Sequence, residues 1–84
     1  MKLHELKIKI RYFYHISSEE KTFELRKNDR DFQVGDLIHF VDTKGKEIDC
    51  YEDNLYKITY ILKDFTEYGL NKDYCILSIE KVRI

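Results

Sequence analysis

The sequence of 84 residues contains no proline and no tryptophan, and it has only three glycines, two cysteines and one methionine. Two cysteines in a chain without a secretion signal are more often thiols than a disulfide, so we expect none between Cys50 and Cys75. No Cys-x-x-Cys pair occurs, and His4, His15 and His39 are scattered along the chain. The pattern therefore predicts no metal site, and nothing in it indicates a cofactor.

Long apolar runs are also absent. No stretch of about 18 apolar residues exists, so we expect no membrane-spanning helix. The first residues, Met-Lys-Leu-His-Glu, do not resemble a signal peptide. We therefore expect a cytoplasmic protein. With 43% hydrophobic and 14% aromatic residues the chain is not of the disordered class, and no linker or repeat divides it. We predict a single domain over residues 1–84.

The chain also has no large excess of positive charge, because it contains 15 basic and 16 acidic residues and its net charge is −1. A protein that coats nucleic acid would usually carry many more cations to displace counterions from phosphate. The charge is unevenly distributed, however: residues 1–30 hold eight basic and five acidic residues, a balance of +3, and the rest balances at −4. This distribution favours one short anionic ligand bound in one place.

The first third of the chain predicts a strand, a helix and a second strand. Residues 4–10 alternate, with His4, Leu6, Ile8 and Ile10 on one face, as in a half-buried strand. We expect His4 to be a hydrogen-bonded core or rim residue. Residues 11–19 have apolar side chains at helical spacing, and residues 22–26 alternate again, so that a strand there is expected to bury Phe23 and Leu25.

The remaining sequence indicates further strands over residues 37–41, 55–63 and 74–82. The last two alternate: one face of the first holds Tyr56, Ile58, Tyr60 and Leu62, with Ile61 as an exception on the other face, and one face of the second holds Cys75, Leu77 and Ile79. Residues 27–33 and 64–73 are expected loops, Val34-Gly35-Asp36 and residues 42–46 are expected turns, and residues 48–54 are expected to form a strand end and loop. Five or six short strands with one early helix suit a small, partly closed barrel, because closure removes exposed strand edges. The predicted fold class is α+β, mainly β, with a short helix between strands one and two; an OB-like or SH3-like barrel fits the same pattern.

Lys21, Glu24 and Arg26 form the most distinctive group of charged residues. Arg26 has the planar fork for bidentate contacts to phosphate or a base edge, Lys21 supplies a point charge, and Glu24 can accept from an exocyclic amine. The residues alone favour a plainer interpretation, a solvated strand face with an ion pair worth little.

Other basic and aromatic residues extend this candidate site. Lys7 and Lys9 share the outward face of the first predicted strand, while Lys27 and Arg30 lie on the loop after the second. The alternative for each is a purely solubilising role. Seven tyrosines have planar rings on which the bases of single-stranded RNA could stack: Tyr12, Tyr14, Tyr51, Tyr56, Tyr60, Tyr68 and Tyr74. Our first candidates among them are Tyr14 and Tyr68.

The sequence from Lys21 to Asp36 resembles the signature of the ASCH superfamily of small PUA-like barrels, Gly-x-Lys-x-x-Glu-x-Arg followed at a distance by Gly-Asp. The matching residues are Lys21, Glu24, Arg26, Gly35 and Asp36. The run from Phe23 to Asp36, with His4-x-Leu6-Lys7 and Tyr60-Ile61-Leu62-Lys63, resembles more narrowly the uncharacterised DUF3850 branch. The chain departs from these patterns just before Lys21, where Glu19 and Glu20 stand in place of the superfamily's Gly-x, and at Arg11, where the branch is expected to have proline.

The resemblance implies a PUA-like pseudo-barrel and a module that binds RNA or a nucleotide. Together with the neighbouring basic residues named above, the predicted binding site consists of Lys7, Lys9, Lys21, Glu24, Arg26, Lys27 and Arg30. A few superfamily members are amidohydrolases of modified nucleosides, and in that hypothesis Lys21, Thr22 and Glu24 are the catalytic group, with Glu24 in place of the family's threonine. We favour a protein that is not an enzyme. An accessory protein that binds another protein is a third hypothesis with which the sequence is compatible.

Overall fold

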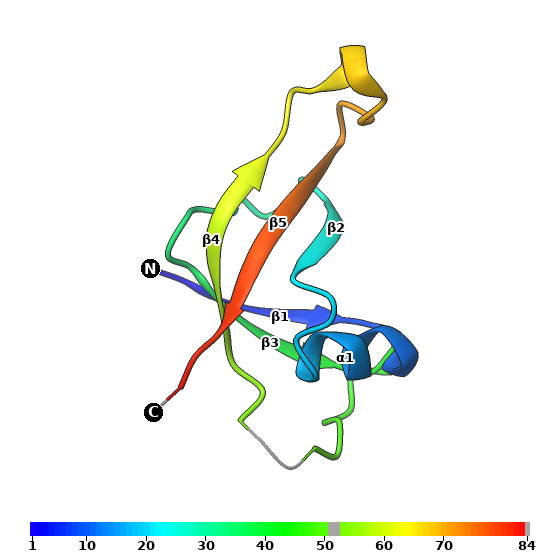
Figure 1. Ribbon diagram of the computed structural model, residues 1–84, viewed down its shortest axis with the longest axis vertical. Coiled ribbons are helices and arrows are strands. Elements are labelled where there is room, and N and C mark those ends of the chain that lie inside the picture. Colours follow the sequence, from blue (N-terminus) through cyan, green and yellow to red (C-terminus); the bar gives the residue numbers. More distant parts are fainter. Residues whose placement is uncertain (51–52, 84) are drawn as a thin grey trace.

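The computed structural model describes residues 1–50 and 53–83, and Tyr51 lies outside this range. The chain forms five strands, one α-helix and one short 3-10 helix in the following order (Figure 1): β1 (Leu3–Lys7), α1 (Ile10–Ser17), β2 (Phe23–Lys27), β3 (Leu37–Val41), β4 (Tyr56–Leu62), η1 (Thr66–Tyr68) and β5 (Tyr74–Lys81). The predicted class, α+β and mainly β with one helix between the first two strands, is confirmed.

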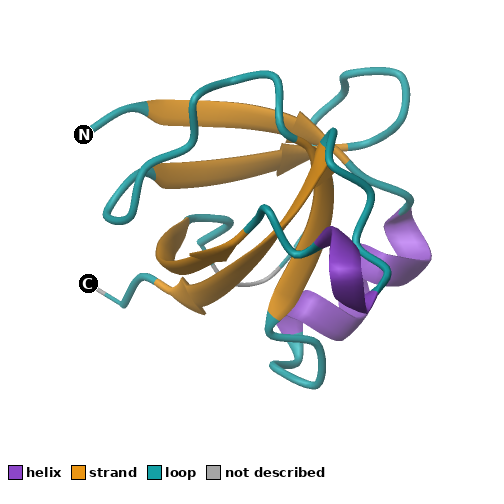
Figure 2. Cartoon of the chain, turned by 90° about the horizontal axis from the view of Figure 1, so that it is seen from above, coloured by secondary structure: helices purple, strands orange, loops and turns teal. Residues whose placement is uncertain are grey.

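The five strands form one sheet in the order β1-β3-β4-β5-β2. The pair β1 and β3 is parallel, and the other three pairs are antiparallel. The sheet is strongly curled into a half barrel (Figure 2), and the β4–β5 hairpin projects beyond it with η1 at the far end (Figure 1). β1 and β2, the two edge strands, are consecutive strands in sequence but stand at opposite ends of the ladder.

The core fills the inside of this curl. Phe13 and Ile16 of α1 are buried, and the ring of Phe13 meets that of Phe40 edge-on at 6.1 Å. The strands contribute alternate residues to the same cluster, among them Leu6, Ile38, Phe40, Tyr56, Ile58, Cys75, Leu77 and Ile79. Because hydrophobic burial stabilises a domain in proportion to the apolar area removed from water, this single cluster supplies most of the driving force for folding.

The alternation predicted for β5 is confirmed, since Cys75, Leu77 and Ile79 are all buried. The strand at residues 37–41 and the turn after it are also confirmed; Gly45 has a φ of 82°, a conformation that glycine adopts cheaply. Glycine is not used for the turn ahead of β2. There Glu19, one of the two glutamates that stand in place of the superfamily's Gly-x, takes a φ of 66°.

The first strand is shorter than its alternation predicts. Its ladder ends where the N–H of Ile8 donates to the carbonyl of Val41, and the carbonyl of Lys9 then accepts the N–H groups of Tyr12 and Phe13, which starts the helix. Ile10 therefore lies in the first turn of α1 and is exposed, not buried with His4 and Leu6. A residue that continues the period of a strand can still be the first residue of the next element.

The predicted orientation of β2 is wrong. Phe23 and Leu25 are 49% and 54% exposed, whereas Glu24 is only 7% exposed. The register places Glu24 opposite Leu77 and Arg26 opposite Cys75, both of which point into the core. An alternating sequence fixes which residues share a face but not which face is buried, and here the polar set is turned inward.

A β-bulge interrupts the alternation of side chains that was expected along β4. The register passes from Ile58 opposite Ile79 to Tyr60 opposite Ser78, so Thr59 is an extra residue. The side chains beyond it change faces: Tyr60 is exposed, and Ile61 packs against the core. This accounts for Ile61, an apolar residue at a position where simple alternation predicts a polar one.

Candidate functional site

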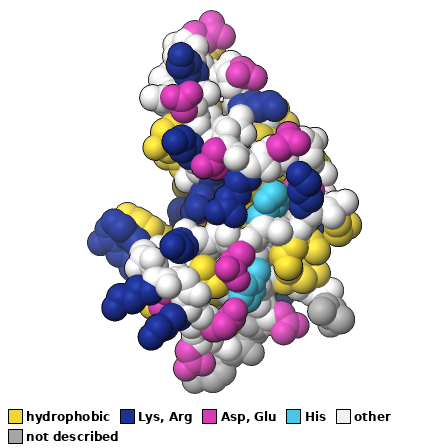
Figure 3. Space-filling view, turned by 180° about the vertical axis from the view of Figure 1, so that it is seen from behind, with side chains coloured by type: hydrophobic (Ala, Val, Ile, Leu, Met, Phe, Trp, Pro, Cys, Tyr) yellow, Lys and Arg dark blue, Asp and Glu magenta, His cyan; other side chains and the backbone are white. Residues whose placement is uncertain are grey.

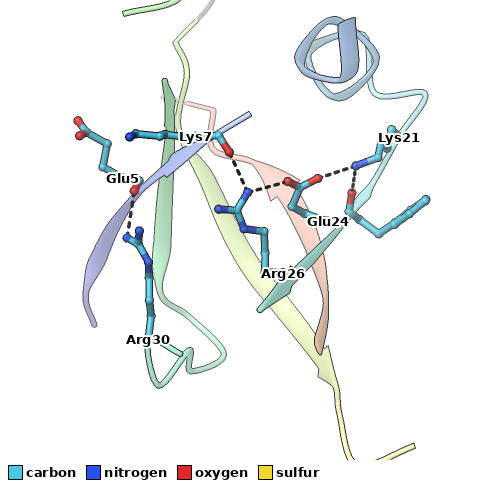
Figure 4. A network of polar contacts seen from close by, with 7 residues as sticks. Glu5, Lys7, Lys21, Glu24, Arg26 and Arg30 are labelled. Carbon is cyan, nitrogen blue, oxygen red and sulfur yellow. Dashed lines mark hydrogen bonds and ion pairs between the residues drawn. The ribbon is translucent and has the colours of Figure 1, made fainter. Parts of the chain in front are cut away.

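The open side of β1 is held by two arginines from the β2 region. Nη1 of Arg26 donates to the carbonyl of Lys7 at 2.9 Å, and Nη1 of Arg30 donates to the carbonyl of Glu5 at 3.1 Å (Figure 4). Leu37 and Val41 bond Lys2 and Ile8, the even-numbered residues that flank β1, so in this parallel ladder the carbonyls of the odd-numbered Glu5 and Lys7 point away from β3. The arginines therefore bridge the two edges of the half barrel.

The buried carboxylate of Glu24 lies between two cations. Its Oε1 accepts from Nζ of Lys21 at 2.7 Å and its Oε2 from Nη1 of Arg26 at 3.1 Å (Figure 4). Lys21 also donates to the carbonyl of Phe23 at 2.7 Å. The side chains of Lys21 and Arg26 remain about one-fifth exposed, at 21% and 22%. Two cations against one anion give this cluster a net charge of +1 that solvent or a ligand can reach.

A cavity of about 350 Å³ opens beside this cluster, between the end of β1, the start of α1 and β2. It is lined by Lys7, Ile8, Lys9, Tyr12, Lys21, Phe23, Glu24, Leu25 and Arg26. The structure thus brings together five of the seven residues predicted from the sequence for the binding site. The remaining two, Lys27 and Arg30, do not line the cavity, although Arg30 donates a hydrogen bond to the nearby carbonyl of Glu5 in β1.

Lys7 takes part in a way that its charge did not predict. Its backbone carbonyl accepts from Arg26, while its ammonium points away from Arg26 and Glu24 (Figure 4). Lysines and arginines gather over the middle of the face opposite to that of Figure 1, with most acidic side chains above and below them (Figure 3). A compact anion would therefore be attracted to this part of the protein surface.

Two aromatic residues of the cavity, Tyr12 and Phe23, were not singled out by sequence reasoning. Nζ of Lys21 lies 4.8 Å from the ring centre of Phe23 and 6.0 Å from that of Tyr12, and the guanidinium of Arg11 lies 4.9 Å from the Tyr12 ring. Tyr12 was named only as one of seven tyrosines available for stacking, and strand alternation assigned Phe23 to the core. The signal that points to Tyr12 is its position directly after Arg11 and three residues after Lys9.

The two tyrosines proposed for stacking lie elsewhere. Tyr14 is exposed on α1 and does not line the cavity. Tyr68 is in η1 at the tip of the hairpin, where its ring stacks on Phe65 with the centres 4.6 Å apart.

Thr22 faces a different and smaller cavity. That space, of about 90 Å³, is lined by Ile16, Glu19, Lys21, Thr22, Tyr56, Ile79, Glu80 and Lys81. Glu24 is not among its lining residues, so the hypothetical catalytic group of Lys21, Thr22 and Glu24 is divided between two cavities. Only Lys21 borders both.

Within the described residues, one group has the donor atoms for a metal ion: Glu5, His39 and Glu47, whose atoms lie within 4.8 Å of one another. His39 is already engaged, with Nδ1 at 2.9 Å from the carbonyl of Asn54 and Nε2 at 2.8 Å from Glu47. Burial opposes the protonation of His39, but these partners and Glu5 outweigh it and raise its pKa. A protonated His39 satisfies both contacts without an ion.

Asp36, a residue of the Gly-Asp pair in the signature, has a structural position. Its buried carboxylate accepts from the backbone N–H groups of Lys2 and Gln33 and from Nε2 of His4 at 2.8 Å. Burial alone would raise the pKa of Asp36, but the hydrogen bonds, that of His4 first, lower it from 3.8 to about 2. The expectation that His4 is a hydrogen-bonded core residue is confirmed.

Among the described residues, none of the helices is long and apolar enough to cross a membrane. Comparison with known families matches residues 3–79 to the family described as a domain of unknown function, DUF3850. A search of curated proteins finds no match.

Proposed function

The chain belongs to the DUF3850 family, whose model matches residues 3–79. We propose that it binds RNA or a nucleotide in the cationic cavity beside β2. The observation that carries the proposal is the convergence of Lys9, Lys21 and Arg26 with the ring of Tyr12 on one space of about 350 Å³. Cavities of this size hold small-molecule ligands.

The chemistry of the lining suits the two halves of a nucleotide. Lys9 and Lys21 supply positive charge for a phosphate, and Arg26 adds the planar donors of a guanidinium. Tyr12 and Phe23 supply aromatic surface on which a base can stack, as in many single-strand binding sites. Glu24, which accepts hydrogen bonds only, is placed to receive an exocyclic amine if the ligand displaces one of its cations.

The proposal includes membership of the wider ASCH superfamily with its PUA-like fold. The support is the match of Lys21, Glu24 and Arg26 to the superfamily signature, together with the finding that these residues form one hydrogen-bonded cluster. Hydrolysis of a modified nucleoside has weaker support, because Thr22 and Glu24 border different cavities.

The test is an amide NMR titration with nucleoside monophosphates and short RNA oligomers. We expect shifts clustered on residues 7–12 and 21–26, and a several-fold loss of affinity in Lys9→Gln, since each phosphate contact contributes electrostatically. Lys9 is preferable to Arg26 for the first variant because it is exposed, whereas Arg26 also bridges β1 and β2.

Lys72→Gln, which changes the same charge on the exposed loop near the hairpin tip, is the matched control and should bind as the parent does. If millimolar nucleotide causes no shift around the cavity, or if both variants weaken binding equally, the cavity is not a nucleotide site.

A further inference from the structure

The outer surface of β2, β5 and β4 carries apolar side chains in matched rows. The register places Phe23, Ser78 and Tyr60 side by side in one row, and Leu25, Ile76 and Leu62 in the next. Tyr74 follows, opposite Lys27. We name the six apolar members the outer aromatic face: Phe23, Leu25, Tyr60, Leu62, Tyr74 and Ile76. The bulge at Thr59 creates the face, because without it Tyr60 would point inward.

This face is exposed and continuous with the cavity. Tyr60 is 59% exposed and Tyr74 39%, beside Phe23 and Leu25, which are about half exposed. Phe23 and Leu25 also line the cavity next to Lys21 and Arg26. An occupant of the cavity that continues past Phe23 therefore passes directly onto the outer aromatic face.

We propose that the ligand is a short single strand of RNA, with one nucleotide in the cavity and the following bases stacked on Phe23, Tyr60 and Tyr74. The proposal rests on the proposed function and narrows it, since a free mononucleotide would leave the outer aromatic face unused. Exposed aromatic rings on a sheet surface are a recurrent platform for unstacked bases.

The spacing of the rings fits more than one base. Phe23 and Tyr60 stand two strands apart, about 10 Å at the usual strand separation, with the small Ser78 between them. Three stacking steps of about 3.4 Å cover that distance, which leaves room for two bases between the rings. Phe23, at the border of the cavity, would be the first ring that the strand meets.

Charge favours RNA over a protein partner at this place. The outward residues of the three strands include two cations, Lys27 and Lys57, and one acid, Glu80, which the register sets directly opposite Lys57. No other acidic residue of β2, β4 or β5 shares this face, so phosphates crossing it meet no uncompensated negative charge.

The experiment compares matching ligands of two lengths by NMR titration and calorimetry: the nucleoside 5′-monophosphates and the corresponding homotetranucleotides of RNA. The monophosphates report on the cavity alone, and the gain from the longer ligand reports on the outer aromatic face. We expect the tetranucleotide to bind at least fivefold more tightly, because stacking contributes about that much or more per base.

Tyr60→Leu with Tyr74→Leu should remove this gain and leave monophosphate affinity unchanged, while Tyr60→Phe with Tyr74→Phe should retain it. Leucine keeps the face apolar, so the loss would be specific to the ring. Tyr14→Leu, at a comparably exposed tyrosine of α1, is the matched control and should keep the full gain.

Three outcomes would overturn the inference. If tetranucleotides bind no better than monophosphates that do bind, the outer aromatic face is not part of the site, although the cavity is. If neither ligand binds, the proposed function fails and the inference fails with it. If the protein sediments as a dimer that Leu25→Glu dissociates, the face is a contact between two copies of the chain.

Discussion

At the scale of single residues, the side chains most firmly fixed by their partners are not those that would meet a ligand. Asp36 is buried and accepts three hydrogen bonds, two of them from the backbone. It holds the start of β1 and the turn before β3 together through His4, Lys2 and Gln33. We infer that Asp36 of the signature serves the fold alone, while Lys21 and Arg26, which also hold the buried Glu24, border the cavity.

The role of Asp36 predicts a specific dependence of stability on pH. Because the folded-state pKa, about 2, lies below the ordinary value of 3.8, the ionised carboxylate stabilises the protein above pH 3.8, and this contribution is lost as the pH falls through about 2. Asp36→Asn should lower the free energy of unfolding by about 2 kcal/mol at neutral pH. Urea unfolding at a series of pH values should show the two proteins converging near pH 2. A difference that stays constant with pH would mean that the charge of Asp36 is not what stabilises the fold.

At the scale of elements, β2 shows both what the alternation of a sequence predicts and what it omits. The period of two correctly located the strand, but it could not tell that Glu24 is buried and that Phe23 and Leu25 are exposed. Burying a carboxylate is costly unless cations accompany it. Those cations, Lys21 and Arg26, were visible nearby in the sequence. The contact of Arg26 with the carbonyl of Lys7 was not, since it depends on the curl of the whole sheet.

Glu24→Gln is predicted to have opposite effects on stability and on anion binding. The amide cannot balance Lys21 and Arg26, so the free energy of unfolding should fall by about 2 kcal/mol. The charge of the cluster rises from +1 to +2, so inorganic phosphate should bind more tightly. Thermal unfolding and a phosphate titration measure the two effects, with Glu67→Gln at the hairpin tip as the control. Unchanged stability and unchanged phosphate affinity would show that the ion pairs of Glu24 are immaterial.

At the scale of the whole molecule, the periodicity of apolar residues in the sequence predicted the number of strands, the early helix and the single core, because each depends on local patterns of burial. The residues that line the cavity could be predicted from the sequence only in part. Lys21, Glu24 and Arg26 are near one another in the chain, and sequence spacing is enough to group them. Tyr12 joins them only because the fold brings its ring to 6.0 Å from Nζ of Lys21. The outer aromatic face exists only because of the bulge at Thr59. Such features depend on register and curvature, which alternation does not specify.

The balance of charge over the whole molecule predicts how binding should respond to salt. The net charge is −1, yet Lys9 and the cluster of Lys21, Glu24 and Arg26, with its charge of +1, border the cavity, and Lys27 lies on the outer aromatic face beside it. About three phosphates along the strand should therefore be neutralised and no more. For a single strand this corresponds to a slope of roughly −2 in a plot of log affinity against log salt concentration. Titrations of the RNA tetranucleotide between low and physiological salt measure the slope. A value steeper than about −4 would require many more phosphate contacts than the cavity and its border supply, and would indicate an extended nucleic-acid surface instead of a compact site.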